Sequence, residues 1–74
     1  MEIKIGVKGR ILTEGRYKGW TIWIEKYPQE DDTHYQIYYE SPDKTTVYDD
    51  YLWASSWLDH WLEDKGITAI EWNE

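Results

Sequence analysis

Acidic side chains are the most abundant chemically active groups in this 74-residue chain, which carries fifteen Asp and Glu residues. Adjacent acidic pairs include Asp31-Asp32, Asp49-Asp50 and Glu63-Asp64. A calcium-binding loop needs oxygen donors at alternate positions, closed by a bidentate Glu, and the sequence lacks this spacing. We therefore expect no metal site.

The other groups that serve catalysis in many enzymes also lack the patterns that catalysis requires. His34 and His60 fall on the polar sides of a predicted strand and a predicted helix, and neither has a second His at metal-ligand spacing. We expect both at the surface or in local pH-sensitive contacts. Ser55 and Ser56 lack a G-x-S-x-G elbow, no cysteine is present, and no glycine-rich loop precedes a helix. The sequence predicts no catalytic residue and no cofactor, so we expect a binding protein rather than an enzyme.

Aromatic residues are the stronger indication of function. The chain has six Trp, seven Tyr and no Phe, so every aromatic side chain carries a polar group. Each ring buries on the order of 150–250 Å² when packed, and a single domain of this length has too small a core for all of them. Some rings are therefore expected at the surface, where Trp and Tyr are common anchors of protein interfaces.

The charge is unevenly distributed along the chain. Residues 1–24 hold five basic and two acidic residues, a balance of +3, whereas residues 25–74 hold three basic and thirteen acidic residues, a balance of −10. The negative field repels phosphate backbones, so we expect no direct nucleic-acid binding. It attracts basic protein surfaces and speeds association with them. The alternative interpretation is that the charge only keeps a small acidic protein soluble.

The pattern of half-buried strands is alternation of apolar and polar residues, and three stretches show it: residues 2–13, 20–27 and 33–40. Gly6 and Gly9 predict a bulge or bend in the first of these strands. Residues 45–48 are a predicted short fourth strand, and residues 68–72 are a predicted closing strand. Strands that follow one another in the chain can pair antiparallel, because antiparallel strands need only short turns between them.

The second and third strands are predicted to form a hairpin around a polar loop at residues 28–32. Pairing Ile24 with Tyr35 makes one face of the hairpin wholly apolar. The same register sets Glu25 across from His34.

A single helix follows the fourth strand. It starts near Asp50 or near Ser56, where Ser56-x-x-Asp59 has the spacing of a capping box. Gly66 is a predicted C-terminal stop, with Ile67 placed for a hydrophobic contact beyond it. The apolar stripe, which includes the expected core residues Trp57 and Trp61, consists of Ala54, Trp57, Leu58, Trp61 and Leu62.

These elements predict one α+β domain over residues 1–74. We expect an antiparallel sheet of three to five strands with one C-terminal helix packed on one face, in the chain order β-β-β-(β)-α-β. A single helix leaves the second face of the sheet at least partly open.

Two groups of residues are candidate partner-binding sites. Trp23, Tyr27 and Tyr38 fall on the open side of the predicted hairpin, where they form a binding patch or stabilise the sheet by cross-strand contacts. Residues 48–53 combine carboxylates with rings in an irregular link between sheet and helix, or serve as an acidic helix N-terminus. From the acidic part of the chain we expect contributions to partner binding from Asp49, Asp50, Tyr51, Trp53, Asp59 and Glu63.

Part of the chain resembles small uncharacterised acidic bacterial α+β proteins, a group that includes toxin-neutralising immunity proteins and phage-encoded inhibitors. The similarity covers residues 19–72 and assigns no functional residue. The matching stretches are Gly19-Trp20-x-Ile22-x-Ile24, Tyr48-Asp49-Asp50-Tyr51, Leu58-x-x-Trp61-Leu62-Glu63 and Ile70-Glu71-Trp72.

Together these features predict a cytoplasmic, acidic protein-binding module of the inhibitor or immunity type, which docks on a basic surface of a protein partner. Two other functions use the same residues: a carbohydrate-binding module that stacks sugars on exposed rings, and a homodimer that buries its open sheet face. No apolar run approaches the ~20 residues that a membrane span needs, so we expect no membrane contact.

Overall fold

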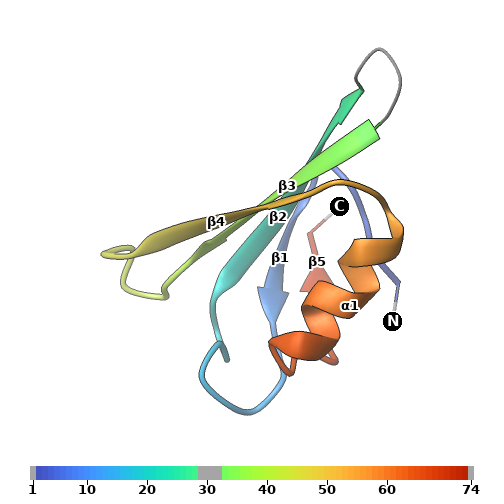
Figure 1. Ribbon diagram of the computed structural model, residues 1–74. Helices are drawn as coiled ribbons and strands as arrows, with labels where there is room; N and C mark the ends of the chain where they lie inside the picture. The colour runs from blue at the N-terminus through green and yellow to red at the C-terminus, as the bar shows by residue number, and fades with distance from the viewer. Residues whose placement is uncertain (1, 29–32, 74) are drawn as a thin grey trace.

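The computed structural model describes residues 2–28 and 33–73. Within these ranges the chain forms five strands and one helix (Figure 1): β1 (Lys8–Ile11), β2 (Thr21–Pro28), β3 (Thr33–Glu40), β4 (Val47–Leu52), α1 (Ser56–Asp64) and β5 (Ile70–Trp72). The predicted α+β class, an antiparallel sheet with one late helix, is confirmed. Most of the predicted polar loop, residues 29–32, lies outside the described residues.

The strands make one antiparallel sheet in the order β4-β3-β2-β1-β5, and α1 lies across one face of it (Figure 1). β1 and β5 are neighbours although they stand near opposite ends of the chain, and Gly9 lies opposite Trp72. A Cβ atom on Gly9 would lie 2.6 Å from Cγ2 of Ile70 and 2.8 Å from Cε3 of Trp72. Glycine at this position therefore makes room for the side chains of β5.

The hairpin of β2 and β3 has a register two residues away from the predicted one. Ile24 lies opposite Ile37 rather than Tyr35, and Ile22 lies opposite Tyr39. This register pairs all eight residues of both strands, from Thr21–Glu40 to Pro28–Thr33. A shift of two residues keeps every side chain on its predicted face, because successive side chains alternate.

The predicted cross-strand pair of Glu25 with His34 is wrong for the same reason. Glu25 lies opposite Gln36, and His34 lies opposite Tyr27. His34 therefore has an aromatic neighbour in place of a carboxylate, with its ring centroid 5.6 Å from that of Tyr27.

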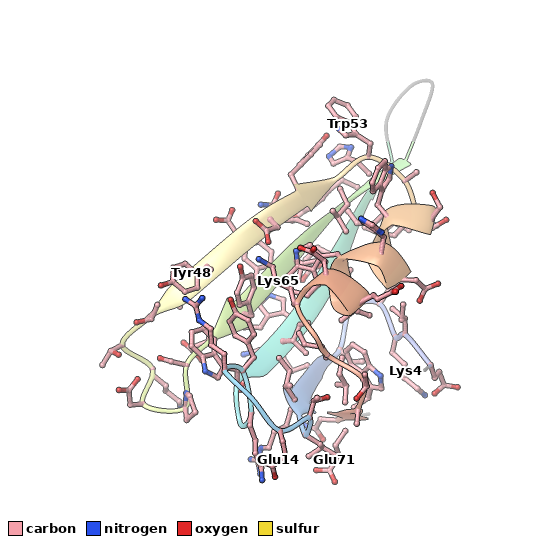
Figure 2. All side chains as sticks on the ribbon, turned by 60° about the horizontal axis from the view of Figure 1, so that its bottom comes forward. Lys4, Glu14, Tyr48, Trp53, Lys65 and Glu71 are labelled. Carbon is pink, nitrogen blue, oxygen red and sulfur yellow. The ribbon has the colours of Figure 1, made fainter. Side chains whose placement is uncertain are left out.

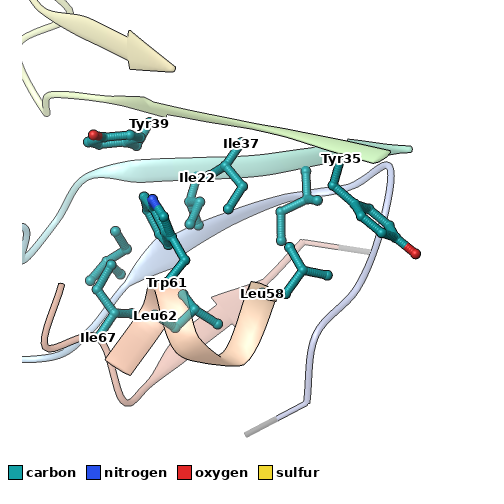
Figure 3. Packing of buried hydrophobic residues seen from close by; sticks show 10 residues of the cluster. Ile22, Tyr35, Ile37, Tyr39, Leu58, Trp61, Leu62 and Ile67 are labelled. Carbon is teal, nitrogen blue, oxygen red and sulfur yellow. The ribbon is translucent and has the colours of Figure 1, made fainter. Parts of the chain in front are cut away.

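The core lies between α1 and the sheet (Figure 3). Leu58, Trp61 and Leu62, at i, i+3 and i+4, form the buried side of the helix as predicted. They belong to one cluster with three fully buried residues of the central strands: Ile22, Ile24 and Ile37.

The prediction that Trp57 belongs to the core is wrong. Its side chain is 50% exposed and packs edge-on against His60, with ring centroids 5.5 Å apart. Trp57 is about 100° around the helix axis from Leu58 and lies beside the stripe of Leu58, Trp61 and Leu62 that reaches the sheet. No helix in residues 2–28 and 33–73 is long and apolar enough to cross a membrane.

The two ends of α1 differ in how well local sequence predicts them. The helix begins at Ser56, the later of the two predicted starts, but the predicted capping box is wrong. The preceding Ser55 has helical dihedral angles, and no side chain caps the N-terminus. The first turn is instead closed by the amide of Leu58, which donates to the carbonyl of Ser55 at 3.0 Å.

The predicted stop at Gly66 is confirmed. Gly66 has φ = 72°, a conformation that glycine adopts without strain. Its amide donates to the carbonyl of Glu63 at 3.0 Å, and the amide of Ile67 donates to the carbonyl of Leu62 at 2.8 Å. This is the Schellman arrangement, and Ile67 is buried in the same core cluster as Leu62.

The first predicted strand is shorter than expected, since only Lys8–Ile11 of residues 2–13 is a strand. Gly6 has φ = 81°, and its amide donates to the carbonyl of Ile24 at 2.8 Å. The chain before β1 therefore turns at this glycine and does not continue the ladder, and Ile5 is left exposed.

We expect Ile37→Ala to reduce the free energy of unfolding by about 2–4 kcal/mol, because it removes fully buried atoms and leaves a cavity. Urea denaturation followed by tryptophan fluorescence measures this. Val47→Thr is the matched control: Val47 is exposed, so its change should stay within about 0.5 kcal/mol. Equal losses for the two variants would contradict the assignment of the core.

Candidate functional site

The face of the sheet opposite α1, called here the open face, carries alternate residues of all five strands. Its members follow from the strand registers: Lys8, Arg10, Thr21, Trp23, Glu25, Tyr27, His34, Gln36, Tyr38, Glu40, Val47, Asp49, Tyr51 and Glu71. The prediction that the second face is partly open is confirmed, since Tyr27 and Tyr51 are each 41% exposed. Trp23 and Tyr38, which the sequence also places here, are half-buried.

A central row of the open face crosses four strands. Lys8, Trp23, Tyr38 and Asp49 lie directly opposite one another on β1, β2, β3 and β4. The ammonium nitrogen of Lys8 lies 4.9 Å from the centre of the Trp23 ring. The rings of Trp23 and Tyr38 stack at 5.4 Å, and Asp49 accepts a hydrogen bond from Nε2 of Gln36 at 2.6 Å. The row therefore runs from a cation, through two rings, to a carboxylate.

A second cluster of rings lies beside this row and reaches the end of β4. His34 is between Tyr27 and Tyr51, with ring centroids at 5.6 Å and 4.6 Å. Trp53 follows β4, packs edge-on against Tyr51 at 5.2 Å and is 65% exposed. We call Tyr27, His34, Tyr51 and Trp53 the ring cluster. Figure 2 shows Trp53 at one end of β4 and Tyr48 near the other.

The two histidines differ from each other. His60 is exposed on α1, as predicted, whereas the expectation of a surface position for His34 is wrong because only 8% of it is accessible. The neighbouring rings shield it. The sequence signal was the aromatic residues that share its face at positions 27 and 51, but their proximity depends on the register of two hairpins.

The Tyr38 hydroxyl forms a hydrogen bond within the same surface. A hydrogen bond with Tyr27 raises the pKa of Tyr38 above its ordinary value, and partial desolvation adds to this. The negative charges of Asp49 and Glu25 act in the same direction. Tyr38 therefore stays protonated at neutral pH, as a neutral hydrogen-bonding group among rings.

The acidic stretch Tyr48–Trp53 was expected to be irregular or the start of a helix, and this is wrong because most of it is strand β4. Alternation along β4 puts Asp49 on the open face and Asp50 on the helix side. Oδ2 of Asp50 accepts hydrogen bonds from Nε1 of Trp61 at 2.6 Å and from the hydroxyl of Tyr39 at 3.3 Å. Asp50 thus connects β4 to the helix.

The remaining two predicted site residues, Asp59 and Glu63, are exposed on α1. The helix and the sheet separate them from the open face (Figure 1). The structure therefore brings together six of the nine predicted residues, on the open face or directly beside it: Trp23, Tyr27, Tyr38, Asp49, Tyr51 and Trp53.

Recognition is the chemistry that this arrangement suits. It offers exposed rings for desolvated contact and carboxylates for charged hydrogen bonds. Within residues 2–28 and 33–73 no three His, Asp or Glu side chains gather as a metal ion would require. Comparison of the chain with protein families, with curated proteins and with solved structures finds no match.

The Asp50 contacts predict unequal roles for the two adjacent aspartates. Asp50→Ala leaves the indole N–H of the buried Trp61 without its partner, so we expect a loss of about 1–3 kcal/mol in the free energy of unfolding. Asp49→Ala should cost about 0.5 kcal/mol or less, because Asp49 is exposed and water can replace its contact. Chemical denaturation of both variants measures the difference, and similar values would exclude an anchoring role for Asp50.

Tyr39 predicts a loss of stability in alkali. Burial, followed by the negative charge of Asp50, raises the pKa of Tyr39 from 10.0 to about 12. The folded state holds this proton more tightly than the unfolded chain, so its contribution is complete below pH 10 and is lost between pH 10 and 12. Between pH 8 and 12 the free energy of unfolding should fall by about 2 kcal/mol less in Tyr39→Phe than in the wild type. Urea denaturation over this pH range measures the difference. Identical pH profiles for the two proteins would contradict it.

Proposed function

We propose that this chain is a small protein-binding module that docks on a basic surface of another protein, in the manner of an inhibitor or immunity protein. The observation that carries the proposal is the ring cluster, whose members Tyr27, Tyr51 and Trp53 are exposed beside Asp49 on a sheet face that α1 does not cover. The proposed setting is the cytoplasm, with a protein partner and without nucleic acid or membrane. Catalysis has no part in it.

The rings and the carboxylates of this surface have different roles in the proposed docking. Tyr51 and Trp53 enter apolar recesses of the partner, since large rings provide most of the energy at protein interfaces. Asp49 and the neighbouring Glu25 and Glu40 pair with Lys or Arg side chains of the partner. The balance of −10 over residues 25–74 speeds the encounter. A protein that normally grips phosphates presents such a basic surface.

The stacking of the rings favours a protein over a carbohydrate as the ligand. A sugar stacks on the free face of a ring, whereas Trp23 has Lys8 over its ring and Tyr38 stacked on it. His34 likewise lies between two tyrosines. Ring faces of Trp23 and His34 are therefore already covered within the chain, which disfavours the stacking of a sugar on them.

Trp53→Ala should abolish capture of the partner, with Trp57→Ala as the matched control. Both tryptophans are largely exposed, so neither change disturbs the core, but Trp57 lies on α1 away from the open face. The immobilised protein is incubated with native lysate at about 50 mM salt, and retained proteins are identified by mass spectrometry. We expect the wild type and Trp57→Ala to retain the same basic protein, and Trp53→Ala to lose it.

Salt separates this function from its alternatives. Docking between opposite charges weakens as salt rises, because screening shortens the range of exposed charges to about 3 Å at 1 M. Capture that is unaffected by salt, or equally reduced in both Trp variants, would contradict the proposal. A stable dimer in sedimentation that dissociates on Trp53→Ala would identify a homodimer instead.

A further inference from the structure

The outer edge of β4 is a second surface that distinguishes this chain. In the part of the chain that the structure describes, β4 pairs with β3 on one side only. Its other side presents backbone N–H and C=O groups over six residues, and most of its side chains are exposed. The opposite edge of the sheet, β5, has only three residues. An open edge of this length is a template for one more strand.

The sequence of β4, Val-Tyr-Asp-Asp-Tyr-Leu, indicates which strand would fit. Asp49 projects on the open face and Asp50 on the helix side, so both faces carry a carboxylate at the centre of the strand. Tyr48 and Tyr51 flank this pair. A complementary strand has two adjacent basic residues at its centre, because directly opposite side chains share a face and lie about 5 Å apart. Apolar or β-branched residues on each side of them match the tyrosines.

The same charges oppose pairing of two copies of β4. A symmetric antiparallel pair that keeps the open faces on one side can align odd residues only with odd residues, and even only with even. The two registers with the fullest overlap set Asp49 opposite Asp49, or Asp50 opposite Asp50. Like charges directly opposite each other are destabilising. The edge therefore discriminates between its own copy and a basic strand.

We infer that β4 binds an extended basic segment of the partner by adding it to the sheet as a further strand. The inference rests on the proposed function and specifies the form of the partner: a stretch of extended chain with an adjacent pair of Lys or Arg residues. Main-chain hydrogen bonds along the edge supply affinity, and side-chain contacts on alternate faces supply selectivity. Asp49 serves both surfaces, so such a segment lies next to the ring cluster.

A blocked hexapeptide, Thr-Val-Lys-Lys-Val-Thr, tests the edge directly. Titrated into the isotopically labelled protein, it should shift the amide resonances of β4 and slow hydrogen exchange of the β4 amides that point away from β3. Asp49→Lys should weaken binding about fivefold or more, since it replaces an attraction by a repulsion. Asp64→Lys, which makes the same charge change on exposed α1, should leave binding within about twofold.

Two control peptides define the mode of binding. Replacing both lysines by glutamates, or methylating alternate backbone nitrogens, should abolish binding, because the first reverses the charge and the second blocks the ladder. Equal binding of the glutamate peptide would overturn the inference. Shifts confined to Trp23, Tyr38 and the ring cluster would also overturn it and leave the proposed function standing. If the protein captures a partner from lysate but binds no peptide at about 10 mM, the inference is likewise overturned and the proposed function still stands.

Discussion

A helix of nine residues has to cover a sheet of five strands. Such a helix is about 14 Å long and about 10 Å wide, whereas five strands at about 4.8 Å spacing span about 19 Å. It therefore covers only part of one face, and the other face has no helix against it. A single short helix on one side accounts for the open face and for burial that is limited to Leu58, Trp61 and Leu62 on α1.

Rings replace part of the missing second layer. On the open face the aromatic side chains cover the backbone of β2 and β3 by stacking across strands, and they keep His34 almost inaccessible. On the helix side Tyr39 contacts both Tyr17 and Trp61, which extends the core beyond the reach of the helix. Tyr and Trp suit this task because they bury a large area and still tolerate contact with water at their polar atoms.

Sequence periodicity was sufficient for the elements whose pattern is local. The buried positions Leu58, Trp61 and Leu62, the end of α1 at Gly66 and the two faces of the β2–β3 hairpin depend on residues close in sequence. These were predicted correctly, whereas Trp57 was wrongly included in the buried stripe. The register of the hairpin was not predicted correctly, because a shift of two residues leaves the alternation of apolar and polar residues unchanged. Residues from different strands were assigned to a common face correctly, but their contacts within it depended on that register.

β4 shows the limit of local preference most clearly. Aspartate is rare in strands and frequent before helices, so Asp49-Asp50 indicated a helix start. Two long-range effects outweigh that preference: the six-residue pairing with β3 and the hydrogen bonds of Asp50 with Trp61 and Tyr39. Asp50 is separated by eleven residues from each of these partners, which no short window of sequence reveals.

The pairing of β1 with β5 determines when the molecule can finish folding. Ile11 lies opposite Ile70, so β1 gains its second neighbour only after residues 70–72 have been synthesised. Closing a loop of this length costs entropy before the contacts between β1 and β5 can form. Before that, β1 can pair only with β2, and Gly9 does not lie opposite Trp72. β2, β3 and β4 are contiguous in the chain and pair with each other, whereas the pairing of β1 with β5 is long-range, and long-range pairing is the kind of contact that slows folding.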